Sequence, residues 1–172
     1  MAPRYDVPKA APAPLRLVQE FVNTVDLEHD REWLAEWLEG RGARPTPRNL
    51  ARAAEVREAL RELLRANNGR GPAKNAIAPL DSAARAAKLT VDFAQQELRP
   101  EARGLEGVLG AVLVVAFTAM ADGSWGRLKS CRNHTCSWAF YDYSKNRSAS
   151  WCSMLLCGNR RKTKAYRVRR RT

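Results

Sequence analysis

The sequence predicts a mainly α-helical fold with a small β-hairpin, in which a helical N-terminal domain precedes a compact C-terminal module. Three observations support this prediction. Apolar residues recur at helical spacing through most of residues 15–120. All four cysteines lie within residues 131–157, and the excess of positive charge lies in the same C-terminal segment. A chain of 172 residues is long enough for one or two small domains.

The apolar pattern of the N-terminal part is typical of amphipathic helices. We expect three of them, over residues 15–25, from Asp30 to Gly40 or Gly42, and over residues 47–67. Asp30 is a suitable N-cap for the second helix, and Thr46 followed by Pro47 is typical of the N-cap and first turn of the third. The sequence Asn67–Asn68–Gly69 should end the third helix.

A second group of elements follows a loop rich in Gly and Pro. We expect a short helix over residues 79–88. A strand should come next, because Leu89, Val91 and Phe93 alternate with Thr90, Asp92 and Ala94. Its partner strand should lie near residues 96–99 and complete a hairpin. Residues 105–120 are nearly all apolar, which predicts the central buried helix of the domain.

The N-terminal residues 1–14 hold four prolines and predict a flexible lead-in. They contain no apolar segment typical of a secretory signal. The longest apolar run, residues 108–121, is shorter than the roughly 20 residues that a membrane span needs. We therefore expect a soluble protein of the cytosol without a membrane partner. Cytosolic thiols stay reduced, which favours metal binding or thiol chemistry over disulfides for the cysteines.

The four cysteines form two pairs of the same spacing. Four residues separate Cys131 from Cys136, four separate Cys152 from Cys157, and fifteen lie between the pairs. Zinc takes four ligands in tetrahedral geometry, and two short loops can supply two each. We therefore expect one structural Zn²⁺ per chain on these four residues. Thiol chemistry or simple packing of buried cysteines is the alternative, and His134 could replace one thiolate.

The residues around the cysteines predict a treble-clef-like zinc finger. Trp138, Phe140, Tyr141 and Tyr143 are typical of a short aromatic hairpin, which we expect to turn at residues 144–146. A helix should begin near residues 150–151 and continue through the basic tail. The aromatic side chains would then form a small core of the finger, and stacking on nucleic-acid bases is the alternative.

The positive charge of the chain is confined to its last 46 residues. Residues 127–172 carry 13 Lys and Arg against one acid, Asp142, whereas residues 1–126 are neutral, so this segment holds the whole net charge of +12. Such asymmetry indicates a polyanionic partner, because cations that neutralise phosphates release counterions; a solvated basic tail is the alternative. The candidate nucleic-acid contacts are Arg147, Asn159, Arg160, Arg161, Lys162, Lys164, Arg167, Arg169, Arg170 and Arg171.

Two stretches of the chain resemble known families. The cysteine spacing, the Trp151-Cys-Ser-Met154 run and the Cys157-Gly-Asn-Arg160 run resemble the CGNR zinc finger. Residues 15–26 and the Trp37–Leu38 pair resemble the ABATE domain, which usually precedes this finger. The resemblance implies a bacterial stress-related transcription regulator whose finger binds DNA. The family usually has basic residues just before the Trp-Cys pair, where this chain has Ala149 and Ser150.

We therefore predict a zinc-dependent DNA-binding transcription regulator of the cytoplasm that associates with the nucleoid. Its domains would be the lead-in 1–14, a helical ABATE-like domain 15–126, and the zinc finger with a basic helix 127–172. The helical domain would sense a small-molecule ligand or pair two subunits into a homodimer, and the partner would be double-stranded DNA. An RNA-binding or ribosome-associated module and a zinc-stapled protein adaptor are the alternatives. An enzyme is not expected, because a closed Cys₄ site leaves no open position for catalysis.

Three polar residues lie at the end of the first predicted helix, after its apolar run, namely Asn23, Thr24 and Asp26. We expect them to end that helix through side-chain hydrogen bonds to backbone groups. A polar cluster lining a ligand pocket is the alternative. We also expect the finger to depend on zinc for folding while the helical domain folds without it.

Overall fold

The structure, a computed structural model, describes residues 9–71 and 73–159 of the chain. Within these residues the α-helices are α1 (Arg16–Val22), α2 (Leu34–Glu39), α3 (Pro47–Asn67), α4 (Ile77–Ala86) and α5 (Gly104–Ala121). The antiparallel strand pairs are β1 (Val25–Asp26) with β2 (Arg31–Glu32), β3 (Leu89–Asp92) with β4 (Glu97–Pro100), and β5 (Leu128–Ser130) with β6 (Ala139–Tyr141). Short helical turns are η2 (Lys74–Ala76), η3 (Trp125–Arg127) and η4 (Met154–Gly158). The predicted mainly α fold with small hairpins is confirmed.

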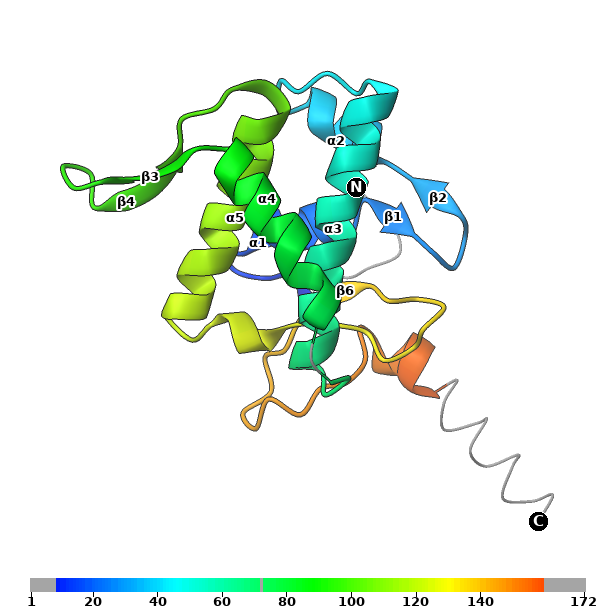
Figure 1. Cartoon of the computed structure of the whole chain (residues 1–172). Helices are drawn as coiled ribbons and strands as arrows, with labels where there is room; N and C mark the ends of the chain where they lie inside the picture. Colours follow the sequence, from blue (N-terminus) through cyan, green and yellow to red (C-terminus); the bar gives the residue numbers. More distant parts are fainter. Residues whose placement is uncertain (1–8, 72, 160–172) are drawn as a thin grey trace, which may run out of the picture.

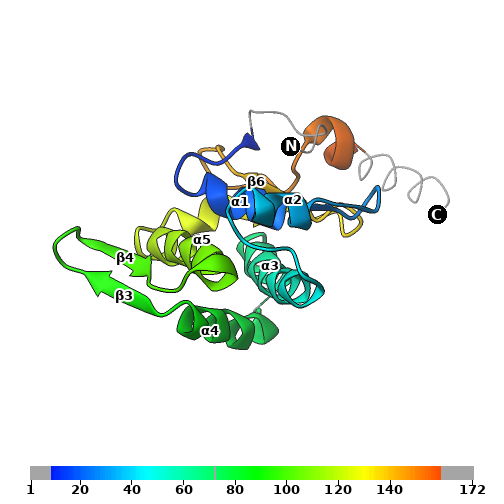
Figure 2. The same ribbon diagram turned by 90° about the horizontal axis from the view of Figure 1, so that it is seen from above.

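Helices α3 and α5 form the centre of the helical half. Helix α4 contacts both of them on one side and α1 contacts both on the other, so that the pair lies between two outer layers (Figures 1 and 2). Val56, Leu60 and Leu64 of α3 and Leu109 and Val112 of α5 are fully buried there. Burial of each such side chain contributes about 1.5–3 kcal/mol. These two helices therefore carry most of the apolar core.

Helix α3 begins and ends where the sequence predicts. The Thr46 hydroxyl accepts a hydrogen bond from the Asn49 backbone N–H at 3.2 Å, and Pro47 is the first helical residue. The proline has no N–H to leave unpaired in the first turn, which is why it is tolerated there. The helix ends at Asn67, and Gly69 follows with φ +74°.

Helix α5 is apolar nearly all round and packs closely against the base of the β3–β4 hairpin. A Cβ at Gly110 would lie 2.7 Å from the Cβ atoms of Ala87 and Pro100, so only glycine permits this approach. With 18 residues, α5 is long and apolar enough to cross a membrane by length and composition alone. The apolar run noted in the sequence, residues 108–121, is shorter than this helix and did not indicate a span. Its buried side nevertheless belongs to the core formed with α1 and α3.

The segment before α2 differs from the prediction. Asp30 does not cap a helix; it lies in the turn between β1 and β2 with φ +51°, and α2 begins only at Leu34. The Asp26 carboxylate explains the difference, because it accepts hydrogen bonds from the backbone N–H groups of Glu28 and His29 at 3.0 and 3.3 Å. These bonds stabilise a turn in place of the first helical turn.

The expected flexible lead-in is partly packed. Ala11 is buried and its backbone N–H donates to the Gln19 side chain at 2.6 Å. The Tyr143 hydroxyl donates to the Ala10 carbonyl at 2.7 Å, and the Lys9 ammonium lies 5.1 Å from the centre of the Phe140 ring. Residues 9–14 therefore lie against both halves of the chain, whereas residues 1–8 are outside the described part.

The strands of the finger pack on the helical half. Strand β5 contacts α3, and β6 contacts α1. Leu128, Ala139 and Tyr141 from these strands belong to the same buried apolar cluster as the helices. The finger thus has part of its core in common with the helical half.

Candidate metal centre and nucleic-acid interface

The four cysteines converge in one buried cluster, as the spacing predicts. Their sulfur atoms all lie within 4.8 Å of one another, and each cysteine is at most 2% exposed. The Cys152 sulfur lies 3.7 Å from those of both Cys136 and Cys157. Tetrahedral zinc with Zn–S bonds of about 2.3 Å requires sulfur atoms about 3.8 Å apart. The cluster therefore fits one Zn²⁺ held by four thiolates, with no position left for a substrate.

The first cysteine pair sits in the loop that joins β5 to β6. The Cys131 N–H donates to the Trp138 carbonyl at 2.9 Å, which closes the loop. Inside it, the Asn133 carbonyl accepts from the N–H groups of Cys136 and Ser137 at 3.0 and 2.8 Å. Ser137 has φ +47° and turns the chain back into β6. This zinc knuckle is thus the tip of a hairpin.

That arrangement corrects the hairpin predicted from sequence. The aromatic strand β6 pairs with β5, which precedes the first cysteine, and not with residues beyond 144–146. The aromatic residues are divided between two clusters. Trp138 and Phe140 lie beside the cysteines, whereas Tyr141 faces the core of the helical half and Tyr143 is 58% exposed. Only the first two therefore form the small core of the finger itself.

The second cysteine pair lies just before, and within, the helical turn η4. Ser153 caps this turn, because its hydroxyl accepts from the Leu156 N–H at 3.3 Å. The turn begins at Met154, three to four residues later than the predicted helix start. Cys152 lies before the turn and Cys157 within it, so that both sulfur atoms face the knuckle.

The electrostatics of the cluster favour a cation. Hydrogen bonds from the other three thiols lower the pKa of Cys157, and its sulfur also accepts from the Asn133 side-chain amide at 3.7 Å. The hydrogen bond with Cys136 raises the pKa of Cys131, and that with Cys131 raises the pKa of Cys152. Four adjacent thiols cannot all ionise without a compensating positive charge, which a divalent metal supplies. The Asn133 amide is an outer partner that orients a ligand.

A buried ion pair shapes the loop between the two cysteine pairs. The Lys129 ammonium donates to the Asp142 carboxylate at 2.7 Å and to the backbone carbonyls of Arg147 and Ala149. Asp142 is fully buried and also accepts from the Ser144 backbone and hydroxyl. Burial by itself would raise the pKa of Asp142, but the hydrogen bonds from Lys129 and Ser144 outweigh it and lower the pKa to about 2. The pair fixes the backbone that leads to Cys152.

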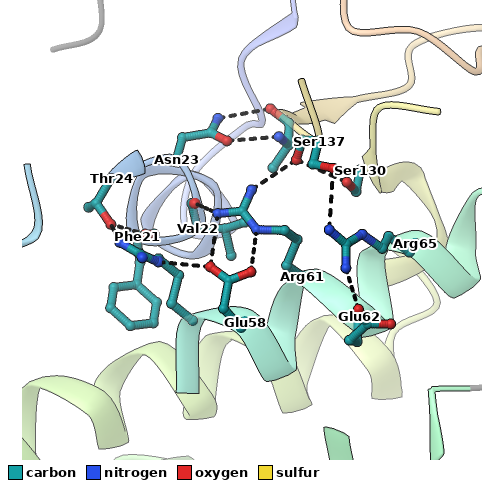
Figure 3. A network of polar contacts seen from close by, with 12 residues as sticks. Phe21, Val22, Asn23, Thr24, Glu58, Arg61, Glu62, Arg65, Ser130 and Ser137 are labelled. Atoms are coloured by element: carbon teal, nitrogen blue, oxygen red, sulfur yellow. Dashed lines mark hydrogen bonds and ion pairs between the residues drawn. The ribbon is translucent and has the colours of Figure 1, made fainter. Parts of the chain in front are cut away.

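Arg61 on α3 joins the finger to the helical half (Figure 3). Its guanidinium is fully buried and donates to the Ser137 carbonyl at 2.9 Å and to the Val22 carbonyl at 2.6 Å. Glu58 accepts from the Nε of Arg61 at 3.0 Å. Burial lowers the pKa of Arg61, and the charge of Glu58 opposes that effect. One side chain thus pairs with the end of α1 and with the knuckle at once.

Two asparagines make further bonds between the halves. The Asn68 amide donates to the carbonyls of Ser130 and Ser150 at 2.7 and 3.0 Å, and so holds both cysteine segments at the end of α3. The Asn23 side chain pairs with the Ala139 backbone in both directions, at 2.9 and 2.7 Å. The Asn23 side chain therefore bonds to β6, and only its backbone N–H bonds to α1, at the Gln19 carbonyl. Thr24 does bond back to α1, through the Phe21 carbonyl at 2.9 Å, as expected.

Few of the predicted nucleic-acid contacts fall in the described part of the chain. Arg147 and Asn159 are exposed there, and Asn159 follows Cys157 by two residues. Arg160, Arg161, Lys162, Lys164, Arg167, Arg169, Arg170 and Arg171 lie outside the described residues.

Sequence reasoning did not single out three further exposed cations, Arg70, Arg132 and Lys145. The Arg132 Nε donates to the Asn68 carbonyl at 3.0 Å, and the Arg70 guanidinium donates to the Arg132 carbonyl. Both arginines thus lie where the end of α3 meets the knuckle. Arg132 follows Cys131 directly, and its place next to a predicted zinc ligand is the sequence feature that marks it as a candidate contact.

The geometry defines a closed four-cysteine zinc finger fixed to a helical domain. Comparison with protein families agrees with this class. Residues 127–170 match the CGNR zinc finger, and residues 15–123 match ABATE, described as "putative stress-induced transcription regulator". The chain belongs to the ABATE family and carries a CGNR finger, so its cofactor is one structural zinc ion. Both descriptions are of regulatory or zinc-finger proteins and not of enzymes. A comparison with curated proteins found no match.

Proposed function

We propose that this chain is a zinc-dependent transcription regulator that binds double-stranded DNA through the finger and the basic segment after it. One observation carries the proposal. The only acid of residues 127–172, Asp142, is fully buried and paired with Lys129. Every exposed charge of this segment is therefore positive, as a surface that neutralises phosphates requires.

The described cations that contribute are Arg132, Lys145 and Arg147, which are exposed in the finger, and Arg70 at the end of α3. No carboxylate pairs with them among residues 9–71 and 73–159. The zinc site has a negative ligand set and cannot attract phosphate itself; it holds the loops that carry these cations. We further propose a cytoplasmic, nucleoid-associated protein without catalytic activity. The small-molecule ligand of the helical half stays a prediction.

Fluorescence anisotropy on labelled duplexes over a salt series tests the proposal. Arg169, Arg170 and Arg171 changed together to Ala should weaken all duplexes alike and reduce the slope of log K against log salt by up to about three phosphate contacts. Arg160→Ala should cost about 1–3 kcal/mol on a preferred site and much less on random DNA. Arg48→Ala, an exposed arginine of α3, is the matched control and should change neither quantity.

Two outcomes would contradict the proposal. If zinc-loaded protein binds no duplex at low salt, the finger is a protein-interaction module. If the protein prefers structured RNA over duplex DNA at every salt concentration, the RNA-binding alternative replaces it. A loss of selectivity in the triple tail variant but not in Arg160→Ala would reverse the roles assigned to the two regions.

A further inference from the structure

The end of the molecule that carries β3, β4 and α5 exposes apolar surface that has no covering element in the described residues. The β3–β4 hairpin projects from the helices as an arm (Figures 1 and 2). Phe93 in its turn is 87% exposed and Val91 is 58% exposed, while Phe117 and Met120 of α5 are 58% and 40% exposed. These four are the large exposed apolar residues of this end.

The arm is amphipathic, and only its base is covered. Because side chains alternate along a strand, Leu89 and Val91 share one face, and the register places Leu98 opposite Val91. Phe93 follows directly in the turn at the tip of the arm. At the base of this face, Leu89 and Pro100 pack on Gly110 of α5. Farther out, the apolar face extends beyond the helix. A two-stranded hairpin is marginally stable alone in water, so an uncovered apolar face indicates a missing partner surface.

Helix α5 supplies the complementary surface on the same side. Phe117 lies seven residues after Gly110, two helical turns along, and therefore on the side of α5 that receives the base of the arm. Seven of the 18 residues of α5 are buried within the chain, Phe117 and Met120 are exposed, and Glu106 is its one charged residue. The arm face and the Phe117 side of α5 thus form two apolar surfaces that meet at Gly110.

We infer that the partner is a second copy of this chain, in a two-fold dimer in which the arm of each copy covers the Phe117 side of α5 in the other. A two-fold interface must be self-complementary, and this end offers both an apolar arm and an apolar helix side. Residues 1–126 hold as many acids as bases, so no net charge of this part opposes contact between two such ends.

The size of the surface also fits a dimer. A stable interface buries roughly 800 Å² on each partner. Phe93 and Phe117, at about 150–250 Å² each when fully buried, together with Val91 and Met120 supply on the order of half of that area. The half-buried Ala111 and Val114 of α5 supply further apolar area. A bilayer fits less well, because α5 cannot insert without removing Leu109 and Val112 from the core.

The dimer also bears on the proposed function. The inference of a dimer does not rest on that function; only the following consequence for DNA binding does. Two copies joined at their neutral ends present two basic fingers, which can occupy two sites on one duplex, as two-fold DNA-binding proteins do.

Sedimentation velocity of full-length, zinc-loaded protein without DNA tests the inference. The wild type should be a dimer, and Phe93→Asp or Phe117→Lys should raise the dimer dissociation constant by about a hundredfold or more, because each change occurs twice in the interface. Ile77→Asp is the matched control: Ile77 is 51% exposed at the start of α4, and its loss should leave the dimer intact. Unchanged zinc content and thermal unfolding would show that each variant is folded.

A mixing experiment sharpens the assignment of contacts. When the Phe93→Asp chain is mixed with the Phe117→Lys chain, one of the two arm contacts keeps both phenylalanines and the other pairs opposite charges. The mixture should therefore form dimers at concentrations at which either variant alone is monomeric.

Three results would overturn the inference, and none of them bears on DNA binding. They are a wild-type protein that stays monomeric at its solubility limit, a dimer that both variants leave unchanged, and a monomer that floats with neutral phosphatidylcholine vesicles unless Phe93 is replaced. The last result would assign the surface to a membrane. If the protein is a dimer but binds no duplex in the anisotropy experiment, the proposed function alone is rejected.

Discussion

In the helical half, α1, α3 and α5 bury a continuous set of apolar side chains, whereas in the finger the buried cluster around the metal site contains four cysteines and only two aromatic residues, Trp138 and Phe140. So small an apolar cluster does not stabilise a fold without further support. The finger receives that support from zinc and from the helical half. Arg61, Asn68 and Asn23 all reach backbone groups of the cysteine segments.

The difference shows that the two halves are unequal partners. The helical half has its own core, but it places a fully buried arginine against the knuckle and shares Leu128, Ala139 and Tyr141 with the finger. Loss of the finger therefore leaves Arg61 without one of its acceptors and exposes apolar surface. We now expect metal loss to weaken both halves, and not the finger alone as the sequence suggested.

The largest expected effect comes from removing a zinc ligand. Cys152→Ser should reduce bound zinc from about one equivalent to well below half, because metal binding supplies the folding energy of such a module. The thermal midpoint of the helical half should fall as well, since its contacts with β5 and β6 are lost. Metal analysis with circular dichroism measures both. A variant with an unchanged helical transition would show that the halves are independent.

The next effect is that of the buried arginine. Arg61→Met should lower the free energy of unfolding by about 3–5 kcal/mol, because the Ser137 and Val22 carbonyls lose this donor and Glu58 keeps only its bond from Arg57. Denaturant unfolding measures it. Arg52→Met on the same helix removes a partly exposed ion pair with Glu55 and should cost less than about 1 kcal/mol. If the two substitutions lower the free energy of unfolding equally, Arg61 does not join the finger to the helical half.

A smaller and pH-dependent effect is expected at Asp142. Its folded pKa of about 2 lies below the unfolded value of about 3.9, so the carboxylate contributes stability that is complete above about pH 4 and is lost as the pH falls toward 2. Asp142→Asn should cost about 2–3 kcal/mol at neutral pH, and the difference from wild type should shrink below pH 4. Urea unfolding at several pH values measures this.

Zinc release at low pH affects wild type and variant alike, so their difference isolates the carboxylate. Asp81→Asn, at an exposed position of α4, should follow the wild-type curve throughout. If the free energies of unfolding of Asp142→Asn and wild type instead differ by the same amount down to pH 2, Lys129 does not hold the carboxylate ionised.

The smallest effect is expected at Asn23. Asn23→Ala removes the paired bonds with the Ala139 backbone and should lower stability by about 1 kcal/mol. Asn75→Ala, at an exposed position in η2, should have no effect. Unchanged stability together with lost regulation in cells would favour a ligand pocket at Asn23.

The sequence predicted those features that depend on side-chain type and spacing. The bounds of α3 followed from Thr46 and Pro47 at one end and Asn67 at the other. The zinc ligands followed from two matched cysteine pairs. Such features are local, or have a fixed chemical requirement, and therefore leave a pattern in the sequence.

The contacts between the halves left no such pattern. Arg61, Asn68 and Asn23 bond to backbone carbonyls, and every residue offers a carbonyl whatever its side chain. Two signals were nevertheless present. Arg61 recurs with Arg57 and Arg65 at four-residue spacing along a face that also carries buried leucines, and Asp142 is the single acid in a strongly basic segment.

Hydrogen exchange of the full chain, with zinc and after removal of zinc by a chelator, tests most directly whether the finger and the helical half form one structure. We expect protection to be lost in β5, β6 and η4 and also at the end of α1 and in the second half of α3, where Val22, Arg61 and Asn68 contact the finger. The distant β3–β4 arm should exchange as before, and protection should return when zinc is added. Loss of protection confined to residues 127–159, with α1 and α3 unchanged, would contradict the joining of the two halves.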